Sequence, residues 1–91
     1  VPYIENTLVV NIGDMMRIIS NDKWKSTIHR VIVKDKHIKY KNNNRRSVAF
    51  FCNLSNESIV KPIVNDNEIP IYESIKAGEY LMMKHNKSIK Y

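Results

Sequence analysis

The apolar residues of this chain come in short runs that are separated by turn-forming residues. Residues 8–12 and 15–19 flank the pair Gly13-Asp14, and the runs 27–33 and 45–53 follow further along. Runs of this length, rich in branched and aromatic side chains, are typical of β-strands. The first two runs, joined by a Gly-Asp turn, predict a β-hairpin.

Strand alternation predicts which side chains share a face. In the run 27–33, His29 shares a face with Val31 and Val33, and the opposite face carries apolar residues on either side of Arg30. We therefore expect both faces to be covered, as in a sandwich or barrel. In the last run Arg45 and Ser47 share one face, whereas Arg46 lies on the other. Arg45 and Ser47 thus point the same way, as joint binding of one anion requires.

The C-terminal part predicts one more strand and one helix. Residues 59–60 precede Lys61-Pro62 and predict a short edge strand. Residues 77–85 predict a helix, in which Gly78 is less favourable than alanine by about 1 kcal/mol. The expected fold class is therefore mainly β, a piece of an antiparallel sandwich or barrel with a C-terminal helix. One side of the helix is expected to carry Ala77, Tyr80, Leu81 and Lys84.

Length and composition limit the chain to one small domain. Its 91 residues can bury only a limited core. Cys52 is the single cysteine, so no internal disulfide can form, and we expect a cytoplasmic protein with Cys52, Phe50 and Phe51 in the core. No apolar run reaches bilayer-spanning length, and the first residues do not resemble a signal peptide. Because the chain opens on Val-Pro without an initiator methionine, we expect it to be a fragment or the last part of a longer protein.

The chain is basic, with a formal net charge of +6. Such an excess can indicate binding to nucleic acid. The basic residues are spread out, however, and those at positions 34–41 are mixed with Asp35. Charge runs of this kind are usually solvated, so we favour a solvated surface over a nucleic-acid patch.

An ordered set of short motifs resembles a known family. These motifs are Val10-Asn11-Ile12-Gly13-Asp14, Ser20-Asn21, Lys25-Ser26, His29-Arg30-Val31, Arg45-x-Ser47 and Phe50-Phe51. In this order they resemble the C-terminal half of the isopenicillin-N-synthase-like non-haem iron oxygenases, most of which depend on 2-oxoglutarate. Residues 77–85 resemble the closing helix of that family. The order of the motifs makes the resemblance specific, since Arg-x-Ser alone would mean little.

The resemblance implies a fold, a site and a reaction. Residues 1–91 would be the C-terminal portion of a double-stranded β-helix, or jelly roll. His29 would be one ligand of Fe(II), and Arg45 and Ser47 would bind the 5-carboxylate of 2-oxoglutarate. Ascorbate is a further candidate cofactor. With dioxygen, the full-length enzyme would oxidise a small organic molecule by hydroxylation, desaturation or ring closure, releasing succinate and CO2.

The sequence also departs from the family pattern. The His-x-Asp pair that supplies the other iron ligands would precede the Val-Asn-x-Gly-Asp motif, and residues 1–7 contain no histidine. We therefore expect the 91-residue chain alone to be inactive, with the missing N-terminal half of the same protein as its partner. Asp22 replaces the glycine of a Ser-Asn-Gly turn, and Lys76 replaces a helix-capping threonine. The loop from His29 to Arg45 is longer than is usual.

Two alternatives remain open at this stage. The chain could be a non-catalytic basic β-sheet module that binds nucleic acid or a protein partner. It lacks the aromatic-rich strand motif of RNA-binding sheets, which counts against nucleic acid. It could instead be a degenerate relic that retains the fold motifs and binds no metal.

Overall fold

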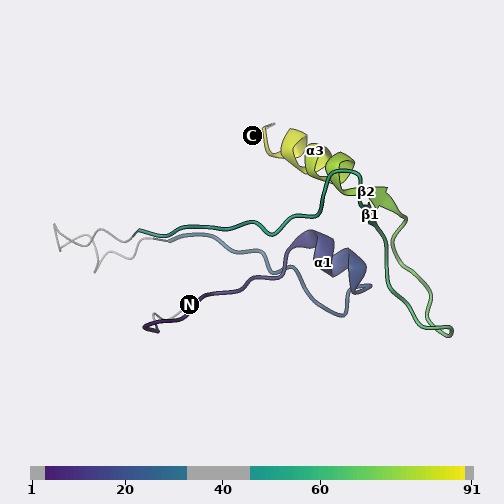
Figure 1. Cartoon of the computed structure of the whole chain (residues 1–91), viewed down its shortest axis with the longest axis horizontal. Coiled ribbons are helices and arrows are strands. Elements are labelled where there is room, and N and C mark those ends of the chain that lie inside the picture. Colours follow the sequence, from purple (N-terminus) through teal and green to yellow (C-terminus); the bar gives the residue numbers. More distant parts are fainter. Residues whose placement is uncertain (1–3, 33–45, 90–91) are drawn as a thin grey trace.

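The chain is described from a computed structural model, which covers residues 4–32 and 46–89. Within these ranges, regular structure is concentrated in a small compact part, from which drawn-out segments extend (Figure 1). The regular elements are α1 (Asp14–Ile19), β1 (Ile59–Val60), β2 (Ile75–Lys76) and α3 (Ala77–Ser88).

Helix α1 replaces the second strand of the expected hairpin, so that prediction is wrong. The N-cap of α1 is Gly13, whose backbone is extended, with φ −85° and ψ 170°. Asp14 lies in the first turn of the helix, where a negative charge complements the helix dipole. Arg17 occupies the last turn, where a positive charge is favoured. Short apolar runs fit a strand or a buried helical turn equally well, and here Ile18 is the residue that becomes buried.

The predicted strand at residues 59–60 is confirmed as β1. It pairs antiparallel with β2, with Ile59 opposite Lys76 and Val60 opposite Ile75. Helix α3 follows β2 directly, which confirms the predicted C-terminal helix and extends it to Ser88. The compact part therefore depends on a pairing between segments that are far apart in the sequence.

Backbone carbonyls, rather than a capping side chain, satisfy the start of α3. Lys76 at the N-cap makes no side-chain cap hydrogen bond. Instead, the Ala77 amide donates to the Ser58 carbonyl at 2.9 Å, and the Gly78 amide donates to the Asn56 carbonyl at 3.0 Å. These bonds supply partners to amides that a helix start leaves unpaired, and they fix α3 against the segment that precedes β1.

A small core lies where these elements meet. Ala77 and Tyr80, which the sequence places on one side of α3, are buried together with Val60 and Ile18. Partly buried Met15, Ile19, Tyr72 and Ile75 pack against this cluster. The buried residues come from α1, β1 and α3, so the core joins the N-terminal and C-terminal parts of the chain.

The remaining predicted strands are not paired within the described residues. Residues 8–12, 27–32 and 46–53 run as exposed segments, with Leu8 92%, Ile28 99% and Val48 98% exposed. The radius of gyration is 17.6 Å, compared with roughly 12 Å for a compact chain of this length. A double-stranded β-helix is therefore neither formed nor contradicted by these segments.

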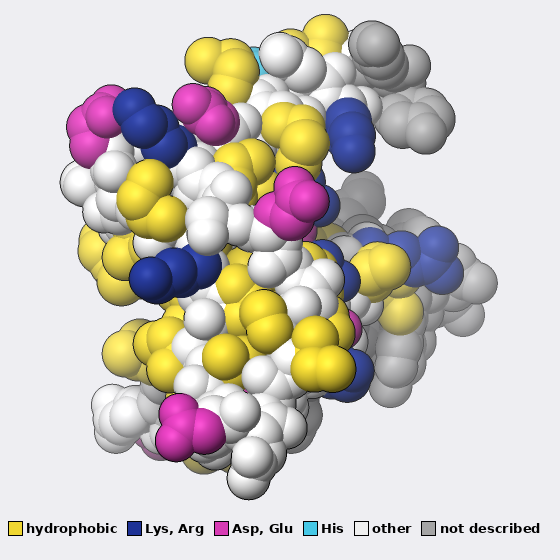
Figure 2. Space-filling model, turned by 90° about the vertical axis from the view of Figure 1, so that its right-hand side faces the viewer, with side chains coloured by type: hydrophobic (Ala, Val, Ile, Leu, Met, Phe, Trp, Pro, Cys, Tyr) yellow, Lys and Arg dark blue, Asp and Glu magenta, His cyan; other side chains and the backbone are white. Residues whose placement is uncertain are grey.

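Phe50, Phe51 and Cys52 are exposed, although the sequence predicts them in a core. They lie on one of the unpaired segments, where no second layer of the described chain covers them. Figure 2 shows apolar side chains at the surface among isolated basic and acidic ones. In the described ranges no helix is long and apolar enough to cross a bilayer.

Candidate functional site

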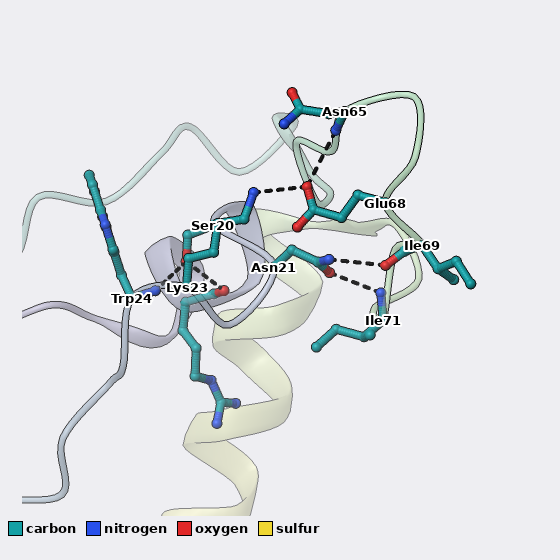
Figure 3. Close-up of polar contacts among 9 residues, drawn as sticks. Ser20, Asn21, Lys23, Trp24, Asn65, Glu68, Ile69 and Ile71 are labelled. Carbon is teal, nitrogen blue, oxygen red and sulfur yellow. Dashed lines mark hydrogen bonds and ion pairs between the residues drawn. The ribbon is translucent and has the colours of Figure 1, made fainter.

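The segment that carries His29 leaves α1 through a tight turn at residues 20–24. The Ser20 hydroxyl donates to the Arg17 carbonyl at 3.1 Å and accepts from the Trp24 amide at 3.0 Å. Figure 3 shows the Ser20 side chain between the end of the helix and Trp24. The sequence predicts a turn here, and the Ser20 side chain closes it, as serine does in many turns.

Asn21 connects this turn to a distant part of the chain. Its side-chain amide donates to the Ile69 carbonyl at 3.0 Å, and its side-chain oxygen accepts from the Ile71 amide at 2.9 Å (Figure 3). The two bonds engage one donor and one acceptor of the same backbone segment. Asn21 has φ 53°, a left-handed conformation that asparagine tolerates better than most residues.

Asp22 stands where the resembled family has glycine, and the structure shows what the change involves. Its φ is 65°, a conformation that favours glycine. The Tyr72 hydroxyl donates to the Asp22 carboxylate at 2.6 Å, which raises the pKa of Tyr72. The guanidinium of Arg17 lies 5.8 Å from the Tyr72 ring centroid and its Nε 3.9 Å from the carboxylate. Asp22 thus has contacts that glycine could not make, at the cost of a less favourable backbone.

Lys23 makes a third connection to the same distant segment. Its ammonium is 2.8 Å from the Glu68 carboxylate, which also accepts from the Asn65 amide at 3.3 Å (Figure 3). The Lys23 hydrogen bond is the largest cause that lowers the pKa of Glu68. Lys23 is exposed, and exposed ion pairs contribute little to stability. We attribute the orientation of the turn mainly to Asn21.

The other end of α1 is fixed by an ion pair with α3. The Lys84 ammonium lies 2.7 Å from the Asp14 carboxylate. This contact is the main reason that the pKa of Asp14 falls from 3.8 to about 2, and the Ser26 hydroxyl lowers it further. Burial is the main cause that raises the pKa of Tyr80, and the nearby Asp14 charge adds to it. Helix α1 is therefore held at both ends by the C-terminal part of the chain.

His29 lies on the exposed segment that follows the turn. Its Nδ1 is 2.9 Å from the Thr27 carbonyl oxygen. A carbonyl only accepts hydrogen bonds, so Nδ1 carries the proton, and in the neutral form of the ring the lone pair is on Nε2. Metal-binding histidines commonly use this arrangement, in which a carbonyl on one ring nitrogen orients the other toward the metal.

The predicted co-substrate residues are only partly described. Ser47 is exposed on the segment that runs from residue 46 to residue 54. Arg45 lies outside the described residues, so the joint orientation of Arg45 and Ser47 stays a prediction. Of the remaining histidines, His85 is exposed near the end of α3, and His37 also lies outside the described residues.

The possible metal ligands among the described residues can be compared with those of an Fe(II) site. Such sites use two histidines and one carboxylate, with open positions for co-substrate and dioxygen. An imidazole that donates a hydrogen bond through Nδ1 can bind a metal through Nε2, as one of these positions requires. Within residues 4–32 and 46–89, however, no three His, Cys, Asp or Glu side chains are grouped as a metal site would require. His29 thus fits as one ligand, and this part of the chain does not complete the set.

The prediction of a solvated surface rather than a nucleic-acid patch stays a prediction. Basic and acidic residues are nearly balanced within residues 4–32 and 46–89, because most of the excess positive charge lies in residues 33–45 and 90–91. On the face shown in Figure 2, dark blue and magenta side chains are interspersed rather than separated. A nucleic-acid interface generally needs basic residues clustered on one face.

Comparison with known proteins identifies the family. Residues 1–54 match the 2OG-Fe(II) oxygenase superfamily. This match covers more than half of the chain and includes the motifs around His29, Arg45 and Ser47. The chain therefore belongs to the 2OG-Fe(II) oxygenase superfamily. For the family in general, membership implies a jelly-roll fold, Fe(II) and 2-oxoglutarate, and the use of dioxygen on a small molecule.

Several curated proteins are similar to most of the chain. Feruloyl CoA ortho-hydroxylase 2 from Arabidopsis thaliana is 37% identical over 84 residues, 89% of this chain and 22% of the relative. Flavonol synthase/flavanone 3-hydroxylase from Solanum tuberosum is 39% identical over 90 residues, 96% of this chain and 24% of the relative. 1-Aminocyclopropane-1-carboxylate oxidase 3 from Cucumis melo is 37% identical over 62 residues, 68% of this chain and 18% of the relative. No solved structure matches the chain significantly.

The chain thus spans about a quarter or less of the length of these relatives. Sequence reasoning reached the family, but it did not identify Asn21 as a structural connection. The Ser-Asn-Asp run indicates a turn, whereas nothing in it identifies Ile69 and Ile71 as partners.

Proposed function

We propose that these 91 residues form the C-terminal portion of an Fe(II)- and 2-oxoglutarate-dependent dioxygenase domain. The domain would oxidise a small organic molecule by hydroxylation, desaturation or ring closure and release succinate and CO2. The remaining portion, including a His-x-Asp pair, would come from polypeptide outside these residues. The polypeptide that contains both portions is called the full-length protein. The 91-residue chain alone would be inactive.

The observation that carries this proposal is the hydrogen bond between the His29 ring and the Thr27 carbonyl. With Nδ1 donating to the Thr27 carbonyl at 2.9 Å, Nε2 keeps its lone pair without any change of tautomer. His29 would therefore hold Fe(II) through Nε2, beside the histidine and aspartate of the other portion. Bound Fe(II) would supply the position at which dioxygen is activated.

Arg45 and Ser47 would bind the distal carboxylate of 2-oxoglutarate. A guanidinium can donate two parallel hydrogen bonds to a carboxylate, and a serine hydroxyl adds another donor. Strand alternation supports the pairing, because it gives Arg45 and Ser47 one face and Arg46 the other. The role of this chain toward the co-substrate would be to bind and orient it.

The names of the relatives support a small organic substrate. One acts on feruloyl CoA, a second on 1-aminocyclopropane-1-carboxylate and a third on flavanones. These molecules differ in size and charge, so we propose only their shared class for this protein. The chain covers about a quarter or less of each relative, and most of the pocket that selects the substrate would lie in the other portion.

The test is succinate production by the full-length protein supplied with Fe(II), 2-oxoglutarate and ascorbate. Succinate release reports the use of 2-oxoglutarate directly, whichever small molecule is oxidised. Arg45→Glu should abolish it by repelling the carboxylate, whereas Arg46→Glu on the opposite face should leave it nearly unchanged. Equal turnover by the wild type and Arg45→Glu would remove Arg45 from the site. Equal loss in both arginine variants would refute the face assignment.

A further inference from the structure

The path from α1 to His29 depends on the turn at residues 20–24. His29 follows shortly after Trp24, and the intervening chain makes no helix or paired strand. The position of the His29 ring therefore depends on where, and in which direction, the chain leaves the turn. Whatever fixes the turn also limits the positions that His29 can occupy.

The turn is fixed by a segment beyond the family match. The match ends at residue 54, and the turn contacts residues 63–72. The Ile63 amide donates to the Ile19 carbonyl at 2.9 Å, just before the turn. Asn21 then bonds both Ile69 and Ile71, as Figure 3 shows. The family motifs thus account for one side of this contact but not for the other.

Asn21 is the residue in the turn best suited to this role. It holds the opposing backbone by a donor and an acceptor at once, at 3.0 Å and 2.9 Å. Two bonds from one short side chain to the opposing backbone restrict rotation as well as distance. Asp22 accepts one bond, from the Tyr72 side chain and not from the backbone, and the flexible Lys23 side chain makes one exposed contact with Glu68. Because α1 is also fixed at Asp14 by Lys84, with 2.7 Å between the charged atoms, the helix cannot easily pivot.

We propose that Asn21 is a positioning residue for His29, because its bridge to Ile69 and Ile71 fixes the turn from which the His29 segment departs. This inference rests on the proposed function, since it takes His29 to be a metal ligand. It adds that residues 63–72, outside the matched motifs, help to determine the geometry of the metal site. Asn21 would not contact the metal or the substrate.

The experiment uses Asn21→Gly in the full-length protein. Glycine retains access to the left-handed conformation at φ 53° but removes both side-chain hydrogen bonds. Co(II), a spectroscopic probe of such sites, would be titrated by visible absorption, and unfolding by urea would be measured in parallel. We expect the Kd for Co(II) to rise about tenfold, the lower end of the range for residues that orient metal ligands.

Two further variants separate positioning from general destabilisation. Lys23→Ala removes an exposed contact between the same two segments and should change the Kd by less than about twofold. Asn21→Asp keeps the acceptor for Ile71 but places a carboxylate oxygen against the Ile69 carbonyl, where two acceptors repel, so its Kd should rise at least as much as that of Asn21→Gly. It also serves as the second probe if Asn21→Gly does not fold.

The outcomes distinguish this inference from the proposed function. If the wild type binds Co(II), His29→Ala abolishes that binding and the Asn21 variants leave it unchanged, the inference is overturned while the proposed function stands. The same holds if Lys23→Ala weakens binding as much as Asn21→Gly. If the wild type shows no binding that depends on His29, the proposed function fails and the inference fails with it.

Discussion

Gly78 near the start of α3 provides a sharp test of the packing between this helix and the segment before β1. In a helix with open surroundings, glycine to alanine would stabilise the protein by up to about 1 kcal/mol. In this structure, a Cβ at Gly78 would lie 3.0 Å from the Asn56 Cβ, 3.2 Å from its Cγ and 3.2 Å from its carbonyl oxygen. That carbonyl accepts the Gly78 amide at 3.0 Å, so it cannot retreat without weakening the bond.

The expected magnitude follows from these two opposing effects. Overpacking of this kind costs roughly 1–3 kcal/mol, which exceeds the gain in helix propensity. Gly78→Ala should therefore lower the free energy of unfolding by about 1 kcal/mol. The assay is urea unfolding of the full-length protein followed by circular dichroism. The close contact, rather than the conformational freedom of glycine, would then explain glycine at this position.

Gly13→Ala is the matched control. A Cβ at Gly13 meets nothing within 4 Å, and the backbone φ is −85°, which suits alanine. We expect a loss of about 0.5 kcal/mol at most, because alanine is a poorer N-cap than glycine. Stabilisation of the protein by Gly78→Ala would refute the packing described for α3. Adding Asn56→Gly should recover part of the loss by removing the two nearest side-chain atoms.

Two further predictions concern the core and the ion pair between the helices. Val60 is fully buried, so Val60→Ala should lower the free energy of unfolding by about 2 kcal/mol. Val48→Ala, at a position that is 98% exposed, should cost less, and equal losses would contradict the core assignment. The folded-state pKa of Asp14 is about 2, below its ordinary 3.8, so its contribution is present above pH 4 and is lost as pH falls toward 2. Allowing for solvent screening of a partly exposed pair, Asp14→Asn should cost about 1 kcal/mol at pH 7 and little near pH 2 in urea unfolding. A pH-independent difference would exclude the Lys84 ion pair as its cause.

The parts of the fold that could be predicted from the sequence depend on local signals. The helical periodicity after Lys76 predicts α3, and branched residues before a proline predict β1. The strand predicted over residues 15–19 was wrong because a short apolar run does not distinguish a strand from a buried helical turn. Strand β2 was missed because Ile75 and Lys76 are ordered by pairing with β1 and carry little strand signal of their own.

In the candidate site, too, local motifs could be predicted from the sequence, whereas contacts that depend on the folded backbone could not. Ordered motifs in the sequence indicated His29, Arg45 and Ser47 and the family to which the chain belongs. The sequence could not indicate the partners of Asn21, because the backbone groups at residues 69 and 71 are independent of side-chain type. It also could not indicate the Thr27 carbonyl as the partner of His29, since that contact depends on local backbone geometry.

Anaerobic Fe(II) binding by the full-length protein tests the central claim most directly. We predict one Fe(II) bound per chain in the wild type, loss of binding in His29→Ala, and unchanged binding in His85→Ala, whose imidazole is exposed near the end of α3. Equal Fe(II) binding by the wild type and His29→Ala would contradict the claim that this chain supplies a ligand of the oxygenase site.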